Sequence, residues 1–144
     1  MLGLLALLTG LAYGQTLGNE FVYDDYYIVL QNPLLKRLDS LPHLLVAEWW
    51  EPADSTQDLE GPLESRPGHG DRRYRPLVAV TYVLNYVIGG PNPVGYHLVN
   101  LLLHAGVSGL LYVVGVELGW TAGAALVAAG LFAVHPLHTE AVAW

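Results

Sequence analysis

Two adjacent carboxylates, Asp24 and Asp25, follow the first apolar run of the chain. A carboxyl group just outside a membrane, where the dielectric constant falls, tends to have a raised pKa and can then serve as a general base. The alternative is an N-cap for a helix over Tyr26–Leu30, with both acids solvated. The residue types alone leave both interpretations open.

A second ionisable group, formed by His135, His138 and Glu140, closes the last apolar run. Ionisable side chains at membrane depth are costly and are functional by default. Imidazole and carboxylate groups also suit zinc or manganese, so a divalent metal site is one alternative. Capping of the membrane interface is the other.

The apolar segment that starts at Val94 carries three polar side chains on one helical stripe, because His97, Asn100 and His104 are spaced at i, i+3 and i+7. Such groups must face protein or water rather than lipid. They either hydrogen-bond to neighbouring helices or line a path for protons or ions.

Arg75 ends a basic segment just before another apolar stretch. Its guanidinium group can form a bidentate fork with phosphate oxygens. Contact with ordinary lipid headgroups explains the same residue equally well.

Three apolar runs can position these side chains in a membrane, namely residues 1–17, 94–118 and 122–134, the last of which can be extended through Trp144. A spanning helix needs about 20 residues, and about 17 is the lower limit. The first run therefore just spans, or it is a signal peptide cleaved before Gln15, although it lacks a positively charged start. The third run is rich in alanine and glycine, which lets transmembrane backbones approach closely.

The segment 77–88 is apolar but has only about twelve residues, too few to cross ~30 Å of hydrocarbon. With three crossings, the acids and the segment 135–140 lie on the same side of the membrane. The Lys and Arg residues lie in a loop of nearly sixty residues, for which the positive-inside rule is weak, so charge leaves the orientation open.

The composition agrees with a membrane protein, because 53% of the residues are hydrophobic and only 13% are charged. The net charge of −7 argues against nucleic-acid binding. The sequence has no cysteine, which excludes disulfide frameworks and thiolate metal sites.

Four motifs, taken together, resemble the transmembrane, tetratricopeptide-repeat-containing O-mannosyltransferases and their bacterial relatives. The motifs, in chain order, are Phe21–Asp25 (FVYDD), Tyr74–Leu77 (YRPL) with Leu84–Tyr86 (LNY), Tyr96–His104 (YHLVNLLLH) and Leu131–Val142 (LFAVHPLHTEAV). Their order along the chain is more specific than any one of them.

The resemblance implies an all-α membrane protein that is a fragment of a larger glycosyltransferase fold of the C type. Three transmembrane helices are expected at 1–17, 94–118 and 122–144, the last with its exit motif. Residues 18–93 would form an extracytoplasmic loop with the acidic motif and a juxtamembrane helix at 77–88. Full-length members continue into further spans and tetratricopeptide repeats, so this stretch alone is expected to be inactive.

The resemblance also implies roles for the polar side chains. Asp24 or Asp25 would be the base that deprotonates an acceptor Ser or Thr hydroxyl. The groups expected to bind or neutralise the donor phosphate, directly or through a divalent metal ion, are Arg75, His135, His138 and Glu140.

The expected partners are a polyprenyl-phosphate-linked sugar, a protein acceptor and the lipid bilayer, with mannose as the sugar in the eukaryotic branch. We expect the bacterial plasma membrane, or the endoplasmic reticulum membrane if the protein is eukaryotic. Two other classes compete with the transferase. One is a non-catalytic anchor or assembly module for a tetratricopeptide-repeat protein, and the other is a transporter or channel that uses the polar stripe.

Overall fold

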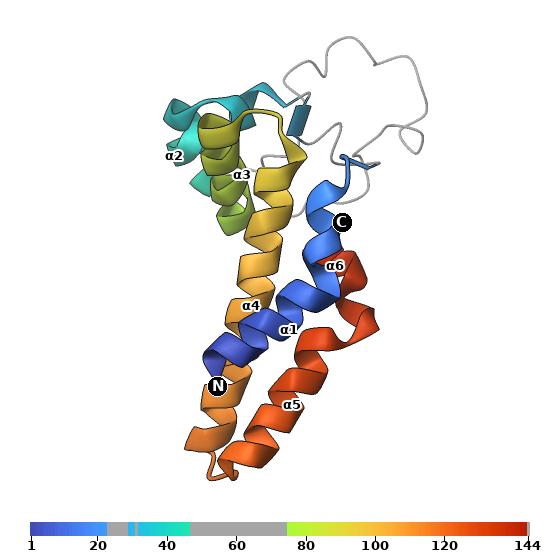
Figure 1. The fold of residues 1–144 in the computed structure, drawn as a ribbon. Coiled ribbons are helices and arrows are strands. Elements are labelled where there is room, and N and C mark those ends of the chain that lie inside the picture. The colour runs from blue at the N-terminus through green and yellow to red at the C-terminus, as the bar shows by residue number, and fades with distance from the viewer. Residues whose placement is uncertain (23–28, 31, 47–74, 144) are drawn as a thin grey trace, which may run out of the picture. The chain divides into compact units, whose positions relative to one another are not determined.

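The computed structural model describes residues 1–22, 29–30, 32–46 and 75–143 of the chain (Figure 1). Within these residues the secondary structure is helical and contains no strand, which confirms the predicted all-α class. The chain forms two compact units, Met1–Glu20 with Pro93–Trp144, and Phe21–Asn92.

The first unit contains two long helices that run antiparallel, with a third helix packed against both (Figure 1). The antiparallel pair is α4 (Pro93–Glu117) and α5 (Ala122–Val134), and the third helix is α1 (Leu2–Tyr13). The remaining elements are η1 (Gly14–Gly18), η6 (Pro136–His138) and α6 (Thr139–Ala143).

The turn between α4 and α5 is fixed by a glycine in the left-handed region, Gly119, with φ +86°. Its N–H donates to the carbonyl of Val116, and the N–H of Trp120 donates to the carbonyl of Gly115. This pair of hydrogen bonds is a Schellman motif, which ends a helix by satisfying its last carbonyls. The Thr121 hydroxyl then accepts from a backbone N–H at 3.2 Å and caps the start of α5.

Small side chains allow α4 and α5 to pack closely. Ala125, Ala129 and Ala133 form the buried face of α5, and Ser108 and Gly115 are buried on α4. A Cβ at Gly115 would lie only 3.0 Å from the Ala125 Cβ. The close approach is typical of packing between membrane helices.

The helix α5 ends at Val134, and the exit motif of the predicted segment 122–144 follows that end. Pro136 has no N–H and disfavours a helical conformation in the residue before it, so His135 is extended, with φ −69° and ψ 126°. The chain resumes as η6 and α6 after a bend of 46°.

By length and composition, α4 is long and apolar enough to cross a membrane, with 25 residues and a mean hydropathy of 1.8. Only 17% of the apolar 18-residue stretch of α4 is buried inside the structure, which leaves most of this stretch available to lipid. The bent pair α5 and α6 passes as one broken span, whereas Leu2–Gly18 is a shorter apolar helix. One helix, α4, therefore meets the criteria for a span by itself, and the count of three stays a prediction.

The second unit contains η3 (Pro33–Lys36), η4 (Leu38–Ser40), α2 (Leu41–Val46) and α3 (Pro76–Gly89). Its core is apolar and consists of the buried side chains Leu35, Leu44, Ala79 and Val83. A helix thus occupies the segment 77–88, and it is also too short to meet the length criterion for a span. Its place beside a membrane stays a prediction.

Candidate functional site

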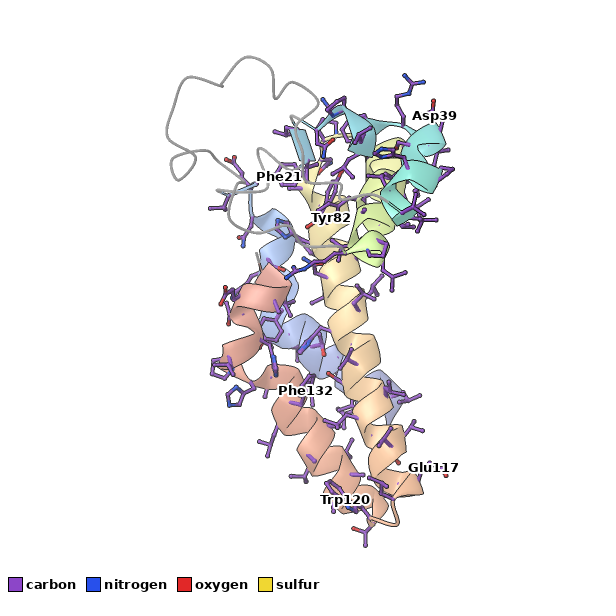
Figure 2. All side chains as sticks on the ribbon, turned by 180° about the vertical axis from the view of Figure 1, so that it is seen from behind. Phe21, Asp39, Tyr82, Glu117, Trp120 and Phe132 are labelled. Carbon is purple, nitrogen blue, oxygen red and sulfur yellow. The ribbon has the colours of Figure 1, made fainter. Side chains whose placement is uncertain are left out.

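In the first unit, five rings from α1, α4, the end of α5 and η6 gather into one group, which we call the histidine–aromatic cluster. Its members are Tyr13, His104, Phe132, His135 and His138. Figure 2 labels Phe132 on α5, and it labels Glu117 and Trp120 at the other end of the α4–α5 pair. The cluster therefore lies away from the turn that joins the two helices.

A hydrogen bond from α4 compensates for the interrupted end of α5. The carbonyl of Ala133 would normally accept from the N–H of Leu137, but that N–H donates to the Nδ1 atom of His135 at 3.2 Å. The Ala133 carbonyl instead lies 3.1 Å from the Nε2 atom of His104. Because a carbonyl oxygen only accepts, the Nε2 atom of His104 must carry the hydrogen.

A second hydrogen bond comes from α1. The Tyr13 hydroxyl donates to the carbonyl of His135 at 2.5 Å. The same carbonyl oxygen accepts the backbone N–H of His138 at 3.1 Å. Tyr13 and the backbone of His138 are therefore joined through one oxygen atom.

The rings also pack on one another. The His104 ring lies edge-on to Tyr13, with centroids 5.4 Å apart, and is stacked on Phe132 at 5.3 Å. The His138 ring lies 5.1 Å from His104 and 4.3 Å from Phe132. The ring of His135 is 6.0 Å from that of His138.

The cluster has a buried part and an accessible part, which we call its rim. Tyr13 and His104 are buried, with exposed fractions of 5% and 8%. His138 is half-buried, and His135 is exposed. The two histidines on the rim can thus meet a ligand while the buried pair holds the backbone beneath them.

The structure brings only part of the predicted site together. His104 was predicted in the polar stripe, and it lies beside His138 of the exit motif. Glu140 is exposed in the first turn of α6. The two predicted bases, Asp24 and Asp25, lie outside the described residues.

Arg75 is exposed at the start of α3, and its backbone carbonyl accepts from the N–H of Ala79 at 3.1 Å. It belongs to the second unit. Its predicted approach to the histidines of the first unit therefore stays a prediction.

Within the polar stripe, His104 forms the helix–helix hydrogen bond that was one of the two interpretations. His97 is 2% exposed, and neither of its ring nitrogens has a hydrogen-bond partner among the residues that the structure describes. Asn100 is half-buried. The stripe thus contains one histidine bonded to α5 and one buried histidine whose partner does not lie in the described part of the chain.

A metal site is not formed in the part of the chain that the structure describes. Nowhere in that part do three His, Asp or Glu side chains lie close enough to hold a metal ion. The exit-motif residues therefore do not make a metal centre among themselves.

Two members of the cluster, Tyr13 and Phe132, were absent from the predicted site. The available signal for Tyr13 was its hydroxyl group within an uncharged, mostly apolar run. A buried phenol normally needs a hydrogen-bond partner, so its presence there indicated a polar contact. Phe132 gave no such signal, because an aromatic ring in an apolar helix is ordinary core.

Comparison with known proteins gives relatives over nearly the whole chain. The chain is 40% identical over 131 residues to Protein O-mannosyl-transferase Tmtc1 of Drosophila melanogaster, a match that covers 91% of this chain and 14% of that protein. It is 40% identical over 139 residues to Protein O-mannosyl-transferase TMTC2 of Homo sapiens, covering 93% and 15%. Protein O-mannosyl-transferase tmtc2 of Xenopus laevis is 38% identical over 132 residues, covering 92% and 14%.

No family model matches the chain. No solved structure matches it either. The curated relatives nevertheless agree with one another in name, and the identity of 35–40% extends over about nine-tenths of the sequence. Nearly the whole of this chain is therefore homologous to one region of the TMTC protein O-mannosyl-transferases, as the four motifs predicted.

Proposed function

We propose that this region acts within a membrane glycosyltransferase that transfers mannose from a polyprenyl-phosphate donor to a Ser or Thr hydroxyl of a protein. The observation that carries the proposal is the 40% identity to an O-mannosyl-transferase over 91% of the chain. Because the chain spans about 14% of that relative's length, the activity is that of a longer protein containing this region.

In the proposed reaction, the acceptor oxygen attacks C1 of the sugar, and the bond between C1 and the phosphate oxygen breaks. The polyprenyl phosphate leaves with the electron pair. Asp24 or Asp25 takes the proton from the acceptor hydroxyl. General-base assistance of this kind contributes about 10²–10⁴-fold.

The leaving phosphate needs positive charge or hydrogen-bond donors. His138 and His135 are suited to this role because they form the accessible rim of the cluster. Arg75 adds an exposed guanidinium group, which matches phosphate geometry. Glu140 is itself an anion, so it would act through a bound cation or by orienting a histidine.

The membrane arrangement is part of the proposal. We propose three spans at 1–17, 94–118 and 122–144, with the loop 18–93 outside the cytoplasm as the resemblance to the family implies. Downstream spans and tetratricopeptide repeats would complete the protein. The matched relatives are animal proteins, which favours the endoplasmic reticulum over the bacterial plasma membrane.

The first prediction concerns the base. We expect Asp24→Asn or Asp25→Asn to lower sugar transfer by about 10²-fold or more in a full-length transferase containing this region, with normal protein abundance. The substitution keeps the size of the side chain but removes the basic charge. Radiolabelled sugar transfer to a peptide acceptor measures the effect.

Asp39→Asn is the matched control, because Asp39 is an exposed aspartate outside all four motifs. It should transfer at the wild-type rate. Full activity in both the Asp24 and Asp25 variants would exclude the base assignment. That result would favour the non-catalytic anchor.

A further inference from the structure

Tyr13 and His104 are buried polar residues to which the proposed reaction gives no role. They come from two different helices, α1 and α4, and both donate to carbonyls at the interrupted end of α5. The carbonyls that they satisfy belong to Ala133 and His135, on either side of the residue where α5 ends. Both contacts thus restrain the short segment that carries the exit motif.

The restraint extends to one specific side chain, His138. Its backbone N–H shares the His135 carbonyl oxygen with the Tyr13 hydroxyl. Its ring packs against both His104 and Phe132, which are themselves stacked on each other. A movement of either Tyr13 or His104 would therefore change the position or the orientation of the His138 ring.

We infer that Tyr13 and His104 are positioning residues that fix the His138 ring for contact with the donor phosphate. The inference rests on the proposed function for the identity of the ligand. Neither residue needs to touch the donor. Tyr13 and His104 hold His138 in place, and His138 contacts the ligand.

The chemistry of the pair defines which substitutions are informative. Tyr13→Phe removes only the hydroxyl and keeps the ring that lies against His104. His104→Gln keeps an N–H donor near the place of the Nε2 atom, whereas His104→Phe keeps a ring and removes the donor. Tyr112→Phe is the matched control, since Tyr112 is a half-buried tyrosine of α4 outside the cluster.

The geometry is tested first, without reference to activity, by nuclear magnetic resonance of the imidazole groups of the chain in lipid nanodiscs. We expect His104 to carry its proton on Nε2. Tyr13→Phe and His104→Phe should shift the ring resonances of His138, and Tyr112→Phe should not. If the His138 resonances are the same in Tyr13→Phe as in the wild type, the inference is wrong.

The consequence is then measured in a full-length transferase. Tyr13→Phe should lower kcat/KM by about 2- to 10-fold, the range for one neutral hydrogen bond, mainly through a higher KM for the polyprenyl-phosphate donor. His104→Gln should retain more activity than His104→Phe. In a His138→Ala background, Tyr13→Phe should add less than about 2-fold, because both changes act on one group.

Independent, multiplying effects of Tyr13→Phe and His138→Ala would overturn the inference. So would equal losses in His104→Gln and His104→Phe at normal abundance. A His138→Ala variant with the wild-type rate has a different meaning, because it would remove the proposed phosphate role of His138. The resonance shifts alone would then decide whether the ring is positioned by the pair.

Discussion

At the scale of single residues, the second unit contains an ion pair whose contribution is set by pH. Arg37 Nε donates to Asp39 Oδ1 at 2.9 Å, and both side chains are exposed. The hydrogen bond from Arg37 holds the pKa of Asp39 below its ordinary value. A carboxyl group with a lowered folded-state pKa stabilises the fold above its unfolded-state pKa, and this contribution is lost as the pH falls through the folded-state pKa.

We therefore expect Arg37→Gln to raise the pKa of Asp39 towards the ordinary value for an aspartate. Because the pair is exposed, the effect on overall stability should be small. Titration of the Asp39 carboxyl carbon by nuclear magnetic resonance, with and without the substitution, measures the change. An unchanged midpoint would show that the pair does not persist in solution.

At the scale of helices, the close contact between α4 and α5 depends on a glycine, Gly115, which has no side chain. A Cβ at Gly115 would lie 3.0 Å from the Ala125 Cβ and 3.4 Å from Trp120 Cε3. Gly115→Ala should therefore force the helices apart and destabilise the unit by about 1–3 kcal/mol, as overpacking does. Thermal unfolding in detergent, followed by circular dichroism, measures the loss.

Gly106 provides the control in the same helix, since nothing lies within 4 Å of an added Cβ there. Gly106→Ala should be neutral or stabilise α4 by up to ~1 kcal/mol, because alanine favours the helical backbone. Equal effects of the two substitutions would mean that helix propensity, rather than the contact with α5, decides the result at Gly115.

The helices show which features the sequence could predict. The apolar run 94–118 differs from α4 by one residue at each end, because a long apolar segment gives a strong local signal. The apolar run 122–134 coincides with α5, because Pro136 and the polar side chains of the exit motif mark its end. The extension of this span through Trp144 stays a prediction.

The histidine–aromatic cluster was less predictable, because its contacts are long-range. Tyr13 and His135 are 122 positions apart, and His104 and Ala133 are 29 apart. Spacing along one helix could place His97, Asn100 and His104 on a stripe, but it could not choose the helix that they would meet. The choice of partner follows from how α1 and α5 pack on α4.

At the scale of the whole molecule, the direction of the helices in the first unit makes topology testable. Because α4 and α5 are antiparallel, the turn after Glu117 and the exit motif lie at opposite ends of the pair (Figure 1). If α4 and the bent pair of α5 and α6 both cross the membrane, these two places lie on opposite sides. The acidic motif at Asp24 and Asp25 lies on the same side of the membrane as the exit motif only if the segment 77–88 does not cross the membrane.

We therefore expect cysteines introduced singly at Ser55 and Thr139 to react with a membrane-impermeant maleimide from the same side of sealed vesicles. Glu117→Cys should react only from the other side, and it serves as the internal control for vesicle orientation. The wild-type chain has no cysteine, so the background is clean. Labelling of Ser55→Cys and Thr139→Cys from opposite sides would mean that the short helix α3 crosses the membrane. In that case Asp24 and Asp25 could not reach a phosphate held by His138, and the proposed active site would not exist.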